Sequence, residues 1–99
     1  MKAYVISQIV VQDAVRYAEY AARATATVAA FGGRYLARNG TKHAVEGPVP
    51  ERRVVLTEFP SVEQAKAWYA SSAYQAIIGT RHSASEGDIF IIEGVGPTT

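Results

Sequence analysis

Two segments of the sequence are apolar on both faces, and this constrains the fold more than any other feature. In RRVVLTEF (52–59) and DIFIIEGV (88–95), apolar residues occupy both odd and even positions. Successive side chains of a strand point to opposite faces of a sheet, so both faces of these strands need cover. One layer of helices covers only one face. We therefore expect a second copy of the sheet to cover the other, in a homodimer with an isologous interface.

A strand and a long helix precede these segments. Residues 3–11 (AYVISQIVV) are rich in β-branched side chains, which is typical of a strand. Asp13 is suited to cap the next segment, in which apolar residues recur at helical spacing from Ala14 to Phe31. The pair Gly32-Gly33 then predicts the end of the helix.

The dipeptide Asn39-Gly40 lies between two runs that can form strands, which is a strong local signal for a hairpin. A two-residue loop would place Leu36 opposite His43. The following EGPVPE segment is expected to be a surface loop, because proline cannot continue a ladder.

Two capping boxes follow the strand at 52–59. Ser61 with Gln64, and Ser72 with Gln75, predict two successive helix starts. Gly87 is expected to close the second helix, before the last strand.

In the first of these helices, Trp68 and Tyr69 point about 100° apart. We expect Tyr69 to pack on the sheet and Trp68 to lie at the edge.

The order β-α-β(β)-β-α-α-β predicts an α+β fold. It fits a ferredoxin-like, split βαβ sheet with its helices on one face. We expect one domain over residues 1–95 and a short flexible tail at 96–99.

The segments TEFPSVEQAKAWYASSAYQAI, AAFGGRYLAR, VEGP and EGDIFIIEGV resemble the domain-of-unknown-function 1330 (DUF1330) family. The resemblance covers residues 3–95. That family is similar to the dimeric α+β barrel superfamily, which agrees with the dimer expected from the strands. The family implies no activity. Superfamily relatives include cofactor-independent monooxygenases, dismutases, decarboxylases and amino-acid sensors.

Composition excludes several classes. The net charge is +1 and no basic stripe is visible, so we expect no nucleic-acid partner. No cysteine is present, which excludes disulfides and thiolate chemistry. No segment approaches the roughly 20 apolar residues that span a bilayer, and the apolar run near the start is interrupted by Ser7-Gln8, unlike a signal peptide. We expect a cytoplasmic protein.

Few residues offer themselves for catalysis. His43 and His82 lack the spacing of a metal site, so no metal and no cofactor are expected. Solvated histidines are the simpler interpretation. Glu58 ends a strand and would serve as a base only if burial raised its pKa. These three residues are outside candidates for proton transfer.

A stripe on the last helix is the best candidate for a pocket wall. Tyr74, Ile78, Arg81 and Ser85 share one helical face. Arg81 could bind a carboxylate through two hydrogen bonds. It could equally cap the helix or pair with a nearby acidic side chain, Glu86 or Asp88.

The leading hypothesis is a dimeric domain that binds a small organic ligand, carboxylate or aromatic, between helices and sheet. The candidate ligand-binding residues are Tyr4, Tyr69, Tyr74 and Arg81. Two alternatives stay open. One is a cofactor-independent enzyme of the monooxygenase, isomerase or decarboxylase type, and the other is a purely structural dimer.

Overall fold

The computed structural model describes residues 1–96, so most of the tail expected at 96–99 lies outside the described residues. The described part of the chain forms an α+β structure, with the helices and strands in the predicted ferredoxin-like order. Their bounds are β1 Ala3–Val11, α1 Ala14–Ala30, β2 Arg34–Arg38, β3 Arg53–Phe59, α2 Val62–Ala70, α3 Ser72–Ala84 and β4 Ser85–Glu93.

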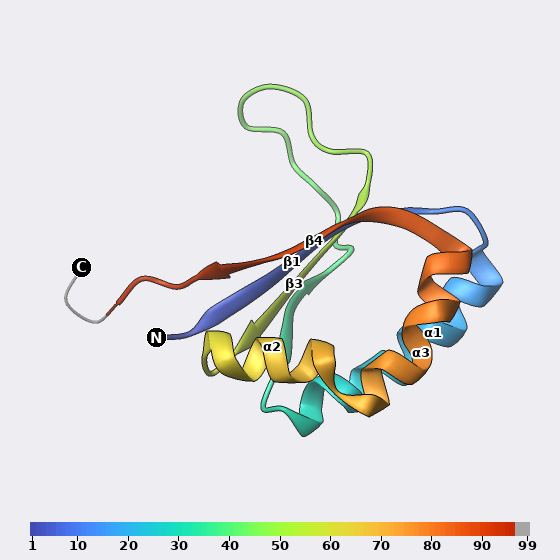
Figure 1. Cartoon of the computed structure of the whole chain (residues 1–99). Coiled ribbons are helices and arrows are strands. Elements are labelled where there is room, and N and C mark those ends of the chain that lie inside the picture. Colours follow the sequence, from blue (N-terminus) through green and yellow to red (C-terminus); the bar gives the residue numbers. More distant parts are fainter. Residues whose placement is uncertain (97–99) are drawn as a thin grey trace.

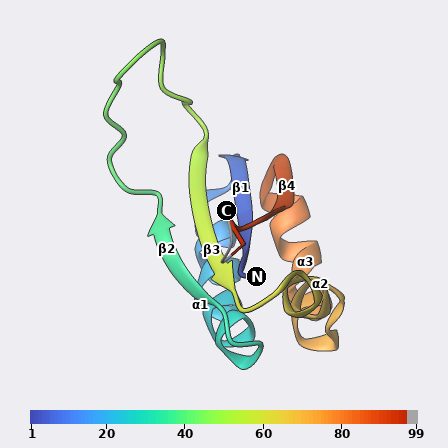
Figure 2. The same ribbon diagram turned by 90° about the vertical axis from the view of Figure 1, so that its left-hand side faces the viewer.

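The four strands form one antiparallel sheet in the order β2-β3-β1-β4. The central strand β1 pairs with both β3 and β4, as a split βαβ fold requires. All three helices lie on the same side of the sheet, with α1 and α3 side by side (Figure 1). A view turned by 90° shows the other side of the sheet uncovered (Figure 2).

The alternation of side chains separates a covered face from an uncovered one. On the covered face, Val5, Ile9 and Phe59 are almost fully buried against the helices. On the uncovered face, Phe90 is 46% exposed and Ile92 is 50% exposed. The apolar character of both faces, visible in the sequence, thus leaves one apolar face without a covering layer in this chain.

Helix α1 has the predicted ends. The Asp13 carboxylate accepts a hydrogen bond of 3.1 Å from the Arg16 backbone N–H. Gly32, at φ 76°, adopts the left-handed conformation that ends many helices. The buried face includes Tyr17, Tyr20 and Val28.

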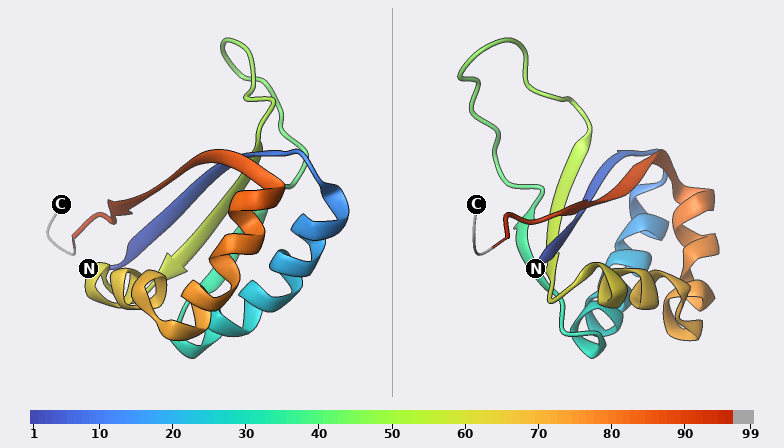
Figure 3. Two further views of the ribbon diagram at one scale, coloured as in Figure 1. Left: turned by 45° about the vertical axis from the view of Figure 1, so that its right-hand side comes forward. Right: turned by 60° about the vertical axis from the view of Figure 1, so that its left-hand side comes forward.

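The predicted hairpin at Asn39-Gly40 is wrong. Strand β2 ends at Arg38, and residues 39–52 form a long loop that projects from the sheet (Figure 3). Asn39 does adopt a positive φ of 57°, but its N–H donates to the Val54 carbonyl oxygen at 2.9 Å. Strand β2 therefore pairs with β3, and His43 is an exposed loop residue.

The serine corner contains two helix starts, as expected, but the second cap is one residue earlier than predicted. Ser61 caps α2 by accepting from the Gln64 N–H at 3.1 Å. Helix α3 is capped by Ser71, which accepts from the Tyr74 N–H at 3.2 Å. The Ser71 hydroxyl also donates to the Trp68 carbonyl oxygen at 2.7 Å, so one side chain serves the ends of both helices.

Helix α3 ends at Ala84, not at Gly87 as predicted. Ser85 ends the helix in an extended conformation, and its hydroxyl donates to the Arg81 carbonyl oxygen at 2.7 Å. Gly87 lies inside β4 at φ 156°, opposite Ile9. A Cβ atom there would collide with the Gln8 carbonyl oxygen of β1, so glycine is needed for close strand contact.

The expectation that Tyr69 packs inward is also wrong. Trp68 is 5% exposed, whereas Tyr69 is 40% exposed. Trp68 lies on the same face of α2 as the fully buried Ala65, three residues earlier. Its indole N–H donates to the Thr27 hydroxyl of α1 at 3.1 Å, so the ring joins α2 to α1.

Candidate functional site: a cavity between helix α1 and the sheet

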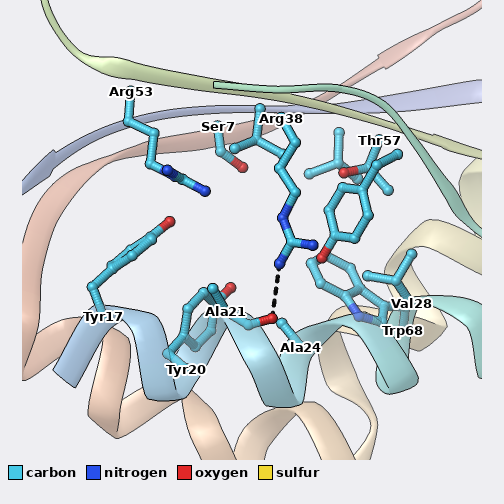
Figure 4. A pocket seen from close by; sticks show the side chains of 13 residues that line it. Ser7, Tyr17, Tyr20, Ala21, Ala24, Val28, Arg38, Arg53, Thr57 and Trp68 are labelled. Atoms are coloured by element: carbon cyan, nitrogen blue, oxygen red, sulfur yellow. Dashed lines mark hydrogen bonds between the residues drawn. The ribbon is translucent and has the colours of Figure 1, made fainter. Parts of the chain in front are cut away.

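A small cavity lies between α1 and the covered face of the sheet (Figure 4). Its volume is about 30 Å³, which suits one or two water molecules rather than an organic ligand. Its lining consists of Val5, Ser7, Tyr17, Tyr20, Ala21, Ala24, Val28, Tyr35, Arg38, Arg53, Val55, Thr57 and Trp68.

Secondary-structure periodicity brings the lining side chains together. On α1 they follow the inward stripe that begins at Tyr17 and ends at Val28. On the strands they occupy alternate positions, so Arg53 and Thr57 point to the same face of β3. Ser7 lies between them on the adjacent strand, because its register partner is Val55.

Two arginines, Arg38 and Arg53, line the side of this cavity that opens outward. The Arg38 guanidinium lies 4.3 Å from the centroid of the Tyr35 ring, and its Nη2 donates to the Ala21 carbonyl oxygen at 2.8 Å. The Arg53 guanidinium lies 5.2 Å from the centroid of the Tyr17 ring. Both guanidinium groups therefore rest on aromatic faces, which favour cations.

Arg53 has an unusual environment for a cation. Its Nε is buried and has no hydrogen-bond partner in the described part of the chain. Among residues 1–96, the ion pairs join Lys2 and Arg34 to Glu58 and Arg52 to Asp88, so neither Arg38 nor Arg53 has a carboxylate within 4.0 Å. The opening thus carries two positive charges that no acidic side chain of the described residues neutralises.

A wider basin adjoins the cavity on the outer side of these arginines. Its volume is about 370 Å³, within the range of small-molecule sites. The cavity and the basin share four side chains, Tyr17, Ala21, Arg38 and Arg53. In the close view, the Arg38 side chain descends from the sheet to α1 between the Arg53 side and the Thr57 side of the site (Figure 4). Arg38 therefore borders both the basin and the cavity.

The sheet wall of the cavity carries two hydroxyl groups. The side chains of Ser7 and Thr57 have no hydrogen-bond partner among the described residues. Thr57 is only 4% exposed, so its hydroxyl is open to the cavity rather than to bulk water. These hydroxyls are polar groups that remain available for a ligand.

A second layer of polar side chains, formed by Tyr74 and Arg81 of α3, lies behind the part of the cavity wall that α1 forms. The hydroxyls of Tyr20 and Tyr74 are joined by a hydrogen bond of 2.7 Å. Burial, reinforced by Tyr74, raises the pKa of Tyr20 far above its ordinary value, and burial also raises the pKa of Tyr74. Both hydroxyls therefore stay protonated at neutral pH.

Arg81 belongs to this second layer. It is 6% exposed, and its guanidinium lies 6.0 Å from the centroid of the Tyr20 ring. Its Nη2 lies 3.2 Å from His82 Nε2, while its Nε has no hydrogen-bond partner among the described residues. Its place in the last turn of α3 is favourable for a cation.

The structure brings together only part of the ligand-binding set proposed from the sequence. Tyr74 and Arg81 lie close to each other and to Tyr20, one layer behind the cavity. Tyr69 is exposed on α2, and Tyr4 lies on the uncovered face of the sheet. Their roles as ligand-binding residues stay predictions.

The three outside candidates for proton transfer lie apart. His43 is in the exposed loop and His82 is exposed on α3. Glu58 accepts hydrogen bonds from Lys2 at 3.1 Å and Arg34 at 3.2 Å. The bond from Lys2, helped by Arg34, holds the pKa of Glu58 below its ordinary value, so Glu58 is poorly suited to act as a base.

Sequence reasoning missed the residues that line the cavity. A usable signal was present on the strands. Arg53 and Thr57 share an alternating face with Val55 and Phe59, so they are polar residues on a face that is otherwise buried. Arg38 had no such signal, because an irregularity in β2 between Tyr35 and Ala37 decides which face its side chain reaches.

Fold and cavity together define a class: an α+β domain whose four-stranded antiparallel sheet and helices enclose a cationic site. A family model described as domain of unknown function (DUF1330) matches residues 2–95. The chain belongs to this family, as the resemblance of its segments indicated. No curated protein gives a significant match.

Several solved structures share the fold at low sequence identity. A protein of unknown function from Rhodopseudomonas palustris is 15% identical with a TM-score of 0.77, over 97% of this chain and 84% of that one. SnoaB, a cofactor-independent oxygenase from Streptomyces nogalater, is 10% identical with a TM-score of 0.69, over 96% and 94% of the two chains. A candidate antibiotic biosynthesis monooxygenase from Caulobacter crescentus CB15 is 17% identical with a TM-score of 0.69, over 96% and 91%.

Two features are absent from residues 1–96. No group of three or more His, Cys, Asp or Glu side chains is placed to hold a metal ion. No helix in this part of the chain combines the length and apolar character needed to cross a bilayer.

Proposed function

We propose that this protein is a binding domain for a small organic carboxylate, held between α1 and the sheet by Arg38 and Arg53. The observation that carries the proposal is the environment of Arg53, whose buried Nε has no partner at the opening of a cavity. An unpaired buried donor costs free energy, and a carboxylate would satisfy it. Arginine also matches the geometry of a carboxylate better than any other cation.

The surroundings favour an aromatic or otherwise flat ligand. Tyr17 and Tyr35 offer ring faces beside the two guanidinium groups. The basin of about 370 Å³ has room for a single ring, whereas the inner cavity of about 30 Å³ does not. The hydrogen bond from Arg38 to the Ala21 carbonyl oxygen is exposed, so Arg38 can exchange it for a bond to a carboxylate at little cost.

The second layer has a supporting role in this proposal. Tyr74 and Arg81 hold the hydroxyl and ring of Tyr20, which contributes to the cavity wall. We propose that they position Tyr20 and do not touch the ligand. This retains the α3 stripe as part of the site but moves the carboxylate contact from Arg81 to Arg53.

We also propose that the protein is a homodimer, formed through the uncovered face of the sheet. That face presents Phe90 and Ile92, which are 46% and 50% exposed. Leaving such side chains in water forfeits the free energy of burial, which is about 25 cal/mol per Å² of apolar surface. The dimeric superfamily that the sequence resembles offers the same arrangement.

A second candidate function is a cofactor-independent oxygenase, and the two arginines favour it specifically. Guanidinium groups at an apolar site stabilise the anionic form of an acidic phenol or enol, and such anions react more readily with dioxygen. SnoaB, which has a similar fold, is described as a cofactor-independent oxygenase. The lining residues include no imidazole or carboxylate, so the substrate itself would have to supply an acidic proton. Oxygen consumption in the presence of hydroxylated aromatic acids tests this function.

The binding proposal is tested by calorimetric titration with benzoate and its uncharged amide, benzamide. We expect benzoate to bind and benzamide to bind at least tenfold more weakly. Arg53→Gln should weaken benzoate binding by about ten- to a hundredfold, since hydrogen bonds to charged groups contribute roughly 1.5–3 kcal/mol. The matched control is Arg52→Gln, which removes an adjacent arginine that pairs with Asp88 at 3.2 Å.

Three results would contradict the proposal. Equal affinity for benzoate and benzamide would show that the arginines do not select a charge. Equal losses in the Arg53→Gln and Arg52→Gln variants would indicate a general effect of surface charge. If monocyclic aromatic carboxylates do not bind at all, the purely structural dimer becomes the better explanation.

A further inference from the structure

We propose that Thr57, assisted by Ser7, is a second recognition point of the same site, selecting aromatic acids that carry a hydroxyl or carbonyl oxygen on the ring. This inference rests on the proposed carboxylate site, and it names the class of ligand. Its starting point is the pair of hydroxyl side chains, Ser7 and Thr57, on the sheet wall of the cavity. The two side chains come from adjacent strands, β3 and β1.

Thr57 differs from the other buried serine and threonine residues of the described chain. Thr27 donates to the Ala24 carbonyl oxygen at 2.7 Å and accepts from Trp68. Ser85 donates to the Arg81 carbonyl oxygen at 2.7 Å. The Thr57 hydroxyl has no such partner among residues 1–96, although it is buried to nearly the same extent. The Thr57 hydroxyl borders a cavity with room for one or two water molecules, so a ligand oxygen could take the place of a water there.

The wall has a fixed geometry relative to the proposed anion anchor. Arg53 and Thr57 lie on the same strand four residues apart, which corresponds to about 13 Å along β3. Ser7 lies between them on the neighbouring strand, as the close view shows (Figure 4).

The basin and the cavity differ in size, so each suits a different part of the ligand. A ring with its carboxylate fits the outer basin of about 370 Å³, beside Tyr17. The inner cavity of about 30 Å³ admits a single oxygen substituent but no ring. A ring oxygen placed there would meet the Thr57 and Ser7 hydroxyls, which can each donate or accept.

The test compares 4-hydroxybenzoate with 4-methylbenzoate, which has nearly the same shape but no oxygen on the ring. We expect wild-type protein to prefer the hydroxylated acid about tenfold, because buried polar groups left unpaired discriminate strongly against an apolar analogue. Thr57→Val should abolish this preference. The matched control is Thr25→Val on the exposed side of α1, which should leave the preference intact.

The possible outcomes separate this inference from the proposed function. If benzoate binds but the preference persists in Thr57→Val, the inference is wrong and the carboxylate site stands. If none of the three acids binds the wild-type protein, both fail. A preference abolished in Thr57→Val and retained in Thr25→Val supports the inference.

A second measurement needs no ligand. Thr57→Val should change the melting temperature of the free protein less than Thr27→Val does, because the Thr57 hydroxyl has no protein partner to lose and valine keeps the shape of the side chain. Thr27→Val should lower it, since that hydroxyl is fully hydrogen-bonded. A comparable loss of stability in both variants would mean that the Thr57 hydroxyl has a structural partner, and the inference would be overturned.

Discussion

At the scale of single residues, Trp68 of α2 is the side chain that packs the three helices together. Its ring centroid lies 4.3 Å from that of Tyr74 on α3 and 5.4 Å from that of Phe59 on β3. Its indole N–H reaches Thr27 on α1. One side chain thus contacts two other helices and a strand, and it also forms part of the cavity wall.

We expect Trp68→Ala to lower the free energy of unfolding by about 3–5 kcal/mol, the usual cost of deleting a large buried aromatic side chain. The adjacent Tyr69→Ala is the matched control and should cost less than about 1 kcal/mol, because Tyr69 is 40% exposed. Urea denaturation of both variants measures the difference. The inward orientation of Trp68 would be contradicted if Tyr69→Ala were the more damaging change.

These residue-scale features show why the sequence predicted the fold better than the site. Helical spacing predicts a helix but does not decide which of two adjacent aromatic residues faces inward, because their directions differ by only about 100°. The answer depends on Thr27, Phe59 and Tyr74, which approach from other elements. The role of Arg53 and Thr57 in the site depends in the same way on which elements pack against their strand.

At the scale of elements, local signals predicted the order of helices and strands correctly. Asp13 and Ser61 cap their helices as expected, because a cap depends on neighbours within one turn. The hairpin predicted at Asn39-Gly40 does not form, because a hairpin also depends on residues beyond the turn. Asn39-Gly40 permits a turn, but no ladder forms beyond it, and strand β2 instead finds its partner in β3.

The corner between α2 and α3 offers a test at this scale. Ser71→Ala should destabilise the protein by about 1–2 kcal/mol, because Ser71 caps α3 and also bonds the end of α2. Ser72→Ala, one residue later, should change stability by less than about 0.5 kcal/mol. Thermal unfolding followed by circular dichroism compares the two. Similar losses in both variants would show that the double serine acts as a unit.

At the scale of the whole molecule, the sheet with one uncovered face bears on assembly. We expect the wild-type protein to be a dimer in solution and Phe90→Glu to convert it to a monomer, because a charge would be buried in the proposed interface. Val15→Glu is the matched control, since Val15 is 73% exposed on α1, on the helical side of the molecule. Analytical ultracentrifugation gives the mass of each. A wild-type protein that sediments as a monomer would refute the sheet-to-sheet dimer.

The position of β1 in the sheet has a consequence for how the protein is made. Its partner β4 is the last strand of the described chain, so nearly all of that chain separates two strands that lie side by side. During synthesis on the ribosome, β1 can pair with β3 first, but its other edge stays unpaired until β4 has been made. Such distant pairing slows folding and lengthens the time during which a nascent chain can associate with others.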